Sequence, residues 1–451
     1  MLKKIKISKY NETIYYEKLE NGLEVFMWPN SNVSSFYATL SVKYGSVDTS
    51  FKIKNKTYEV SKGIAHFLEH LKFNEGPNKT AHEYFNKIGS SINAFTTFDY
   101  TSYEVTASNK LKENITHLLD YVQTPYFTKE LVEKERKIIL SEVKMGKNNP
   151  YQVLYYTLNG TVFSNDNHRN YVTGDIDDVK NITLDEINLV YNTFYHPSNM
   201  FLTITGDFDP EYLSVVIKEN QSTKEFSKYQ DPVRIQLKEP ERVAVRGIDI
   251  AGNIALPKLK LAYKIKKDKL GNLSDLEKLL YVRIILNANF GTTSELKEKL
   301  LESNLITKLG TSATIIGDYL EIVISAETRY PNEITKILKE TYSNMDITKK
   351  RLERRIRCNI ADFIYGLDDI EYTNTIIQDN IIMYNKIITN TYDIIKSLNV
   401  ETASKIIKDI QTENNCFVIM HPIEEKQSPS VWDCLFKYKK TSNRKFFYYL
   451  L

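Results

Sequence analysis

Cysteine is scarce in this chain of 451 residues, and its three cysteines, Cys358, Cys416 and Cys434, lack the spacing of metal ligands or of a disulfide framework. So few cysteines are typical of a reducing compartment, and we expect a cytoplasmic location. No run of about 18 consecutive apolar residues occurs, so no membrane span is predicted. The N-terminus carries early lysine pairs without an apolar stretch behind them, which does not resemble a secretory signal.

Excess charge of either sign is also missing. The chain has 60 lysine and arginine residues against 57 acidic ones, a net charge of +3. We therefore expect neither nucleic acid nor a membrane surface as a partner. With only 16 glycines and 12 prolines, a collagen-like or broadly disordered architecture is excluded as well. The 42% of hydrophobic residues is enough to form a core, and the length suggests two large domains or three smaller ones.

The first half alternates segments typical of strands and helices. Strands are expected at 23–28, 34–46 and 200–206, with a strand or hairpin at 92–107. Helices are expected at 61–73, from the capping box at Thr80, at 109–123 and at 128–146.

The second half repeats this order of elements. A polar segment at 221–240 with two prolines is the candidate linker, and after it come strands at 258–265 and 319–327 and helices at 273–289 and 293–303. The repeated order indicates an internal duplication. We predict an α+β fold of two similar α/β-sandwich domains, residues 1–225 and 226–451, each with a mixed, mostly antiparallel sheet covered by helices.

The most informative segment is 63–70, with the sequence GIAHFLEH. On a helix, His66, Glu69 and His70 share one face. Two imidazoles one turn apart can both reach one metal ion at about 2.0–2.1 Å. A carboxylate between them can take the proton of an attacking water molecule. The alternative is a helix with surface histidines and an ordinary polar contact.

Next to this polar face runs an apolar stripe that should bury the helix against a sheet and leave the polar face lining a cavity. The stripe consists of Ile64, Phe67, Leu68 and Leu71.

Two histidines leave a zinc site one protein ligand short. The helix expected at 128–146 places Glu135, Ile138, Ile139 and Glu142 on one face. Carboxylates on a packing face are costly unless they are paired, and a metal ion or a ligand imidazole would pair them. The alternative is that either glutamate is a solvated helix residue.

The segments GIAHFLEHLKFNEG at 63–76 and KERKIILSEV at 134–143 resemble the pitrilysin/insulinase family of zinc metallopeptidases, the inverzincins, and the chain is most similar to short bacterial members with two domains. The likeness continues at 89–97, 195–200, 206–208 and 290–296. It implies one Zn²⁺ per chain held by His66, His70 and Glu142, with Glu69 as general base and Glu135 as a second catalytic carboxylate that supports the ligands.

The resemblance also implies a peptide-binding strand. Asn93 and Ala94, followed by Phe95 and Thr96, match positions that hold the substrate backbone beside the metal. A small residue at 94 lets an extended peptide approach an edge strand, and Asn93 offers both a donor and an acceptor. The alternative is an ordinary strand start.

One feature departs from the family pattern. Complete active sites also use an Arg and a Tyr from the second domain, and here those positions are Leu301 and Thr307, which cannot hydrogen-bond an oxyanion in the same way. We therefore expect a zinc-dependent endopeptidase that cleaves unfolded peptides or leader segments in a closed chamber, as the zinc-bearing chain of a dimer. The partner is either a related chain that supplies Arg and Tyr or a second copy. A non-hydrolytic peptide-binding or assembly subunit is the other interpretation.

Two further segments have a simpler interpretation. The cluster KKRLERRIR at 349–357 could indicate acidic partners, but its interleaving with Leu352, Glu353 and Ile356 favours a solvated helix face. The isoleucine-rich segment 375–396 is typical of a pair of amphipathic helices that face a core.

Overall fold

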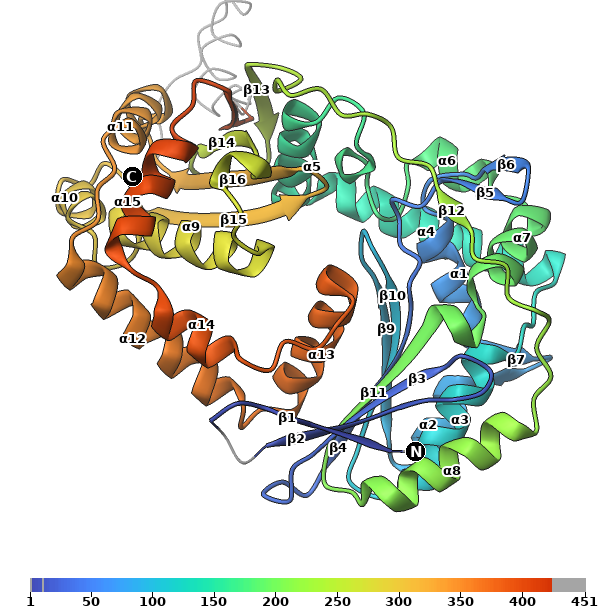
Figure 1. Cartoon of the computed structure of the whole chain (residues 1–451). Helices are drawn as coiled ribbons and strands as arrows, with labels where there is room; N and C mark the ends of the chain where they lie inside the picture. The colour runs from blue at the N-terminus through green and yellow to red at the C-terminus, as the bar shows by residue number, and fades with distance from the viewer. Residues whose placement is uncertain (1, 10–11, 424–451) are drawn as a thin grey trace, which may run out of the picture.

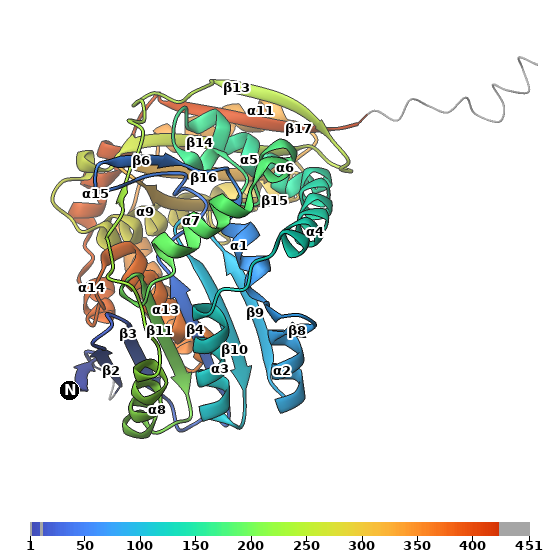
Figure 2. The ribbon, with the colours of Figure 1, turned by 90° about the vertical axis from the view of Figure 1, so that its right-hand side faces the viewer.

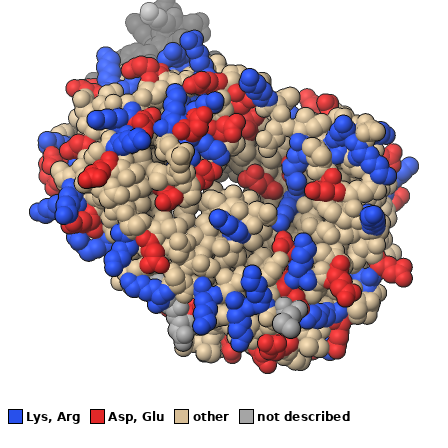
Figure 3. All heavy atoms as spheres, in the orientation of Figure 1, with Lys and Arg blue, Asp and Glu red and all other residues tan. Residues whose placement is uncertain are grey.

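The computed structural model describes residues 2–9 and 12–423, so Cys434 lies outside the described part. Two larger sheets, each covered by helices, form two lobes (Figure 1). Figure 3 shows basic and acidic side chains interspersed over the viewed face, with a hollow between the lobes. Among the helices of the described residues, none combines the length and the apolar character needed to span a bilayer. The expected α+β fold is confirmed.

The first lobe is built on a seven-stranded sheet with the order β1-β2-β3-β11-β4-β10-β9. Its strands are β1 (Lys3–Lys6), β2 (Thr13–Lys18), β3 (Glu24–Pro29), β4 (Phe36–Val42), β9 (Ser91–Thr96), β10 (Thr101–Ala107) and β11 (Met200–Gly206). The helices of this half are α1 (Ile64–Lys72), α2 (Ala81–Ile88), α3 (Leu111–Gln123), α4 (Lys129–Asn148), α5 (Pro150–Val162), α6 (Ile176–Asn181), α7 (Leu184–Phe194) and α8 (Pro210–Ser222).

The second lobe is built on a five-stranded sheet with the order β13-β17-β14-β16-β15. Its strands are β13 (Gly247–Gly252), β14 (Lys258–Lys266), β15 (Lys308–Ile316), β16 (Tyr319–Glu327) and β17 (Asn415–Pro422). The helices are α9 (Asp275–Phe290), α10 (Glu295–Glu302), α11 (Pro331–Ser343), α12 (Lys349–Gly366), α13 (Ile370–Tyr384), α14 (Thr391–Ser397) and α15 (Val400–Ile410).

The two sheets repeat one topology. β3 pairs with β11 in parallel, and β13 pairs with β17 in parallel. Each parallel pair is followed by three antiparallel strands, β11-β4-β10-β9 in one sheet and β17-β14-β16-β15 in the other. β9 and β15 are thus equivalent edge strands, and this correspondence supports the expected duplication.

The candidate linker is shorter and more ordered than expected. α8 extends into it as far as Ser222, and its residues 233–234 form β12 (Val233–Arg234). β12 pairs with β5 (Ser50–Ile53), which itself pairs with β6 (Lys56–Glu59). Short elements complete the fold, namely β7 (Asn74–Gly76), β8 (Lys79–Thr80), η1 (Asn167–Arg169), η2 (Pro197–Asn199) and η3 (Lys267–Leu270).

Each half lends one helix to the sheet of the other half (Figures 1 and 2). α5, from the first half, packs on β14 and β17, where Leu154 and Leu158 share a buried cluster with Ala262. α13, from the second half, packs on β4 and β11, where Ile377 contacts a cluster that contains Phe201. The pair of helices expected at 375–396 exists, but α13 faces the sheet of the opposite half.

Candidate metal centre

The start of α1 depends on Gly63. Its φ of +81° lies in the left-handed region, and a Cβ at this position would overlap the carbonyl oxygen of Thr173. A residue with a side chain would therefore displace the segment that contacts the N-terminus of α1. Glycine at this position lets the helix begin about one turn before His66 and two turns before His70.

The apolar stripe of α1 is buried as predicted. Its four residues are each at most 2% exposed, namely Ile64, Phe67, Leu68 and Leu71. The adjacent face carries His66 and His70, whose side chains are 14% and 19% exposed. Burial of one stripe fixes the rotation of the helix, so both imidazoles are held on the side that faces α4.

The structure brings the two histidines together with Glu142 of α4. One ligand atom from each of His66, His70 and Glu142 lies within 4.8 Å of the others. Glu142 Oε2 is 3.7 Å from His66 Nε2 and 3.4 Å from His70 Nε2. Tetrahedral zinc with bonds of 2.0–2.1 Å separates its ligand atoms by about 3.4 Å. The nitrogen and oxygen donors and their spacing therefore fit one zinc ion.

Glu135 lies next to His70 but is not part of the cluster of His66, His70 and Glu142. Its Oε2 is 3.7 Å from Nδ1 of His70, on the side of the ring opposite to Nε2. Glu135 as a residue is 6% exposed, and a separation of 3.7 Å is longer than a hydrogen bond. Glu135 therefore lies behind the His70 ring, outside the cluster of candidate ligand atoms.

The predicted packing face of α4 is wrong at one residue. Ile139 is completely buried, but Ile138 is 43% exposed. The buried face of α4 is centred on Leu131, Glu135, Ile139 and Val143. The buried face of α4 packs against α1 and α6. Ile138 lies at the edge of this face, as does the partly exposed Glu142, and is therefore open to solvent.

The two imidazoles differ in their electrostatic surroundings. Burial, followed by the nearby His70, lowers the pKa of His66 to about 3. Burial also opposes protonation of His70, but the carboxylates of Glu135, Glu142 and Glu69 outweigh it and raise the pKa of His70. His66 is therefore neutral at physiological pH, as a metal ligand must be. The carboxylates that surround His70 equally favour a bound cation.

Glu69 is held by a contact that the sequence did not indicate. The Thr96 hydroxyl, on β9, donates a hydrogen bond of 2.6 Å to Oε2 of Glu69. Burial raises the pKa of Glu69, although the Thr96 hydrogen bond and His70 both oppose the rise. A carboxylate with a raised pKa is a stronger base near neutral pH. The only available signal was the strand alternation, which places Ala94 and Thr96 on one face of β9.

The four residues of the candidate peptide-binding strand do not share one face. Ala94 packs on the first core, on the face of β9 that Thr96 also occupies. Asn93 is exposed on the opposite face, and Phe95 on that face contacts the ring of Tyr100 at 5.8 Å between centroids. Side-chain contacts of a bound peptide would therefore be divided between the two faces of the strand.

The edges of the two equivalent strands β9 and β15 differ. On β15, the carbonyl oxygens of Leu309 and Ala313 accept hydrogen bonds from Lys297 and Arg283. Within the described residues, no side chain makes such a bond to the backbone of residues 91–96 of β9. Charged side chains that cover an edge hinder the addition of a strand, and of these two edges only that of β15 is covered in this way.

Leu301 and Thr307 belong to the second lobe, whereas the candidate metal ligands belong to helices of the first half. Leu301 is on α10 and is 41% exposed, and Thr307 precedes β15, where its N–H donates to the carbonyl of Glu327. α10 lies on the far side of the second lobe from α1 and α4 (Figure 1). The helix that carries position 301 is thus separated from the helices of the candidate metal ligands by the rest of the second lobe.

Comparison with known proteins assigns the family. Residues 31–175 match the model of Insulinase (Peptidase family M16), and residues 181–357 match that of the Peptidase M16 inactive domain. The uncharacterized zinc protease YmfH of Bacillus subtilis (strain 168) is 32% identical over 419 residues, which are 92% of this chain and 96% of YmfH. The chain belongs to the M16 peptidase family.

Solved structures agree with this assignment to M16. An M16-like peptidase from Alicyclobacillus acidocaldarius superposes with a TM-score of 0.85 at 26% identity, covering 92% of this chain and 99% of that one. A protease from Helicobacter pylori superposes with a TM-score of 0.79 at 21% identity, covering 92% of this chain and all of that one. The second likeness shows the fold alone. All the candidate metal ligands lie in the half that matches the Insulinase model.

Proposed function

We propose that this M16 chain is a zinc-dependent endopeptidase that cleaves unfolded peptides or leader segments. The observation that carries the proposal is the convergence of His66, His70 and Glu142 within 4.8 Å, with Glu69 on the same face of α1. Zinc held by these three residues would supply Lewis acidity, which polarises the scissile carbonyl and makes water easier to deprotonate. The names of zinc-protease relatives such as YmfH support zinc as the metal, with one ion per chain.

The residues around the ligands have distinct roles in this proposal. Glu69 takes the proton of the attacking water and passes it to the leaving amine. Thr96 orients the Glu69 carboxylate through its hydrogen bond of 2.6 Å. Glu135 orients His70 and balances its charge, so that the donor nitrogen stays directed toward Glu142.

The peptide binds as an additional strand along β9. The open edge of β9 supports this placement, because its backbone groups are free to pair with an extended chain. Ala94 leaves room for the close approach of the peptide, and Asn93 is exposed beside it. A chamber enclosed by a second chain would admit extended segments and reject folded proteins.

A partner chain completes the site in this proposal. Leucine at 301 and threonine at 307 provide no pair of donors for a tetrahedral oxyanion. A related chain that carries Arg and Tyr at these positions would supply them from its own second half, and a homodimer would need another donor. We also propose a cytoplasmic location, which the unpaired Cys358 and Cys416 support.

The test combines metal content with peptide cleavage. Protein purified without chelators should contain about one zinc per chain, and His70→Ala should lose it. Glu69→Gln should retain the zinc but lose cleavage of an unfolded peptide by about 10³-fold or more, because a general base typically contributes 10²–10⁴-fold. Full cleavage by Glu69→Gln in a zinc-loaded preparation would overturn the assignment.

A second candidate function follows from Leu301 and Thr307. A chain without the oxyanion pair could serve as a non-hydrolytic peptide-binding or assembly subunit. Purification from the native host separates the two functions. A co-purifying chain of similar size that confers cleavage supports the enzyme. A zinc-free chain that stays inactive in its native assembly supports the scaffold.

A further inference from the structure

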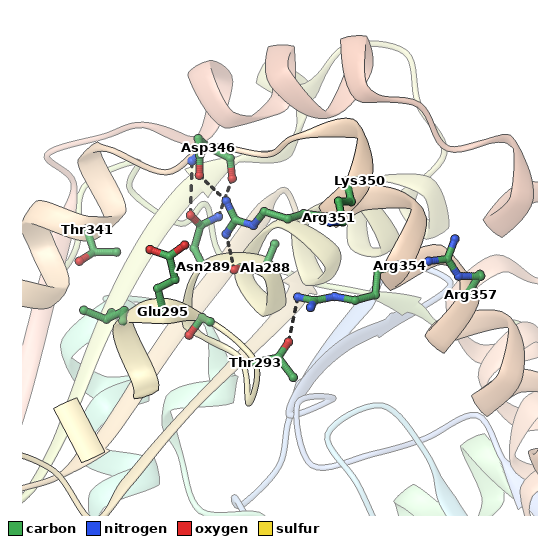
Figure 4. A pocket seen from close by; sticks show the side chains of 12 residues that line it. Ala288, Asn289, Thr293, Glu295, Thr341, Asp346, Lys350, Arg351, Arg354 and Arg357 are labelled. Carbon is green, nitrogen blue, oxygen red and sulfur yellow. Dashed lines mark hydrogen bonds and ion pairs between the residues drawn. The ribbon is translucent and has the colours of Figure 1, made fainter. Parts of the chain in front are cut away.

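A cavity of about 520 Å³ lies far along the chain from the metal ligands, at the corner where α9 ends and α10 and α12 begin (Figure 4). Four basic side chains of α12 line it, namely Lys350, Arg351, Arg354 and Arg357. They belong to the cluster at 349–357, for which a solvated helix face was the favoured interpretation. Lys350, Arg354 and Arg357 are indeed exposed to solvent, and with the half-buried Arg351 they line this open cavity.

Only one of these four cations is neutralised by an acid. Arg351 pairs with Asp346 and donates to the carbonyl of Ala288 at the end of α9, so it holds the corner together. Arg354 reaches only a hydroxyl, that of Thr293 at 3.0 Å (Figure 4). Within the described residues, no carboxylate lies within 4.0 Å of the charged groups of Lys350, Arg354 and Arg357. Glu295 and Asp346 are the acidic residues of the lining, so its four cations leave the cavity with a net positive charge.

Arg355 is a further cation of α12, and the charges of Arg351 and Arg354 act on it. Burial lowers the pKa of Arg355, and the like charges of Arg354 and Arg351 lower it further. Its Nε is buried without a hydrogen-bond partner. Like charges held together in this way are costly without a counter-charge. An anionic ligand in the cavity would remove that cost.

The spacing of the cations points to an extended ligand. Lys350, Arg354 and Arg357 are at positions i, i+4 and i+7, so they form one row along a face of α12. The row spans about 10.5 Å at 1.5 Å per residue. In an extended peptide, side chains on one face repeat every 6.6–6.8 Å or so, and two acidic residues at alternate positions can therefore meet neighbouring cations of the row.

We propose that this cavity binds an acidic, extended segment of a peptide, at a place remote from the bond that is cut. Guanidinium groups bind carboxylates through two parallel hydrogen bonds, which suits both arginines. The choice of a peptide as the ligand rests on the proposed function, because a peptidase binds peptide substrates that can extend from the cleavage site to this cavity. The chain would then prefer peptides with acidic residues distant from the cleavage site.

The experiment measures binding and not cleavage. Full-length protein carrying Glu69→Gln is titrated against a labelled nine-residue peptide with glutamate at alternate positions, and fluorescence anisotropy is read at about 0.15 M salt. We expect the acidic peptide to bind at least about 10-fold more tightly than its glutamine counterpart. Arg357→Gln and Lys350→Gln should each weaken binding by about 5-fold to 10-fold.

Lys349→Gln is the matched control. Lys349 is on the same helix and carries the same charge, but it pairs with Glu353 at 4.0 Å and lies outside the cavity lining. Binding by the Lys349→Gln variant should stay within about 2-fold of the parent. Unchanged thermal melting of all three variants excludes loss of fold as the cause.

Three outcomes overturn the proposal. The glutamine peptide could bind equally well, Lys349→Gln could weaken binding as much as Arg357→Gln, or inorganic phosphate could displace the peptide at stoichiometric concentration. The last result would identify a phosphate site. None of these outcomes affects the peptidase proposal, because the binding protein lacks the general base. Conversely, a chain without cleavage activity can still pass or fail this binding test.

Discussion

Thr96 links β9, the proposed peptide-binding strand, to Glu69, the proposed general base. Its hydroxyl donates to Glu69 at 2.6 Å, and a hydrogen bond to a charged group typically contributes about 1.5–3 kcal/mol. Thr96→Val keeps the shape of the side chain but loses the donor. We expect kcat to fall about 10-fold or more, with KM and zinc content nearly unchanged, in steady-state assays on an unfolded peptide.

Thr96→Ser provides the control for this prediction, because serine restores the donor without the methyl group. The serine variant should recover most of the lost kcat. If valine and serine lower kcat equally, the contribution of Thr96 is packing on β9 and not orientation of Glu69.

The buried carboxyl group of Glu321 should make the stability of the chain depend on pH, independently of any metal ion. Burial raises the pKa of this β16 carboxyl to about 7, against the charges of Lys260, His168 and Lys264, and its Oε1 has no hydrogen-bond partner. The folded chain thus holds this proton more tightly than the unfolded chain, whose carboxyl keeps its ordinary pKa. Stability should therefore fall as the pH rises from about 4.5 to 7, and the whole penalty applies above that range.

Glu321→Gln should remove that penalty. We expect the free energy of unfolding to rise on the order of 2 kcal/mol at pH 8 and to change little at pH 4, as measured by urea denaturation. Glu333→Gln, at an exposed position of α11, should show no such pH-dependent gain. A loss of stability at pH 8 would contradict the prediction, because it would mean that a nearby lysine stabilises the ionised Glu321 carboxylate by more than burial costs.

At the scale of elements, the periodicity of apolar residues predicted which face of a helix is buried, but not which element packs against that face. The spacing along α1 predicted the buried stripe of Ile64 and Phe67, and it was correct because a short helix with one apolar stripe can pack in only one rotation. The wider amphipathic face of α4 left its rim undefined, and so Ile138 was misplaced. The Thr96 contact with Glu69 joins two elements, and no spacing within a single element reports such a contact.

α13 illustrates the same limit. Its isoleucines predicted a helix that faces a core, but apolar periodicity carries no information about which sheet forms that core. The specific contacts are polar. Asn374 is completely buried, where it donates to the carbonyls of Tyr37 and Thr203 and accepts from the hydroxyl of Thr39.

Asn374→Ala should therefore destabilise the whole chain. The change removes three hydrogen bonds between α13 and the first lobe. The Tyr37 carbonyl still accepts from the Thr205 hydroxyl and the Thr39 hydroxyl still accepts from Gln378, so each lost hydrogen bond should cost about 0.5–1.5 kcal/mol. We expect the free energy of unfolding to fall by roughly 2–4 kcal/mol, measured by urea denaturation. Thr375→Ala, one residue along, should cost less than about 1 kcal/mol because Thr375 is exposed. Equal losses would indicate that helix propensity, and not the buried amide, anchors α13.

At the scale of the molecule, the exchange of α5 and α13 joins the two lobes. The sequence predicted a boundary near residue 225 from composition, and that boundary remains a prediction. A cut there leaves α5 without the second sheet and the first sheet without α13. The apolar side of α5 would then be exposed, since Leu154, Leu158 and Val162 are each at most 3% exposed in the whole chain.

We therefore expect the lobes to unfold together. Differential scanning calorimetry of the full chain should give one transition, with a van't Hoff enthalpy close to the calorimetric enthalpy. Residues 1–225 expressed alone should aggregate or bind a hydrophobic dye, because uncovered apolar faces drive association. Co-expression with residues 226–451 should rescue solubility, since each fragment supplies the helix that the other lacks. Two separate transitions, or a monodisperse and folded fragment 1–225, would show instead that each lobe is stable without the helix it receives from the other half.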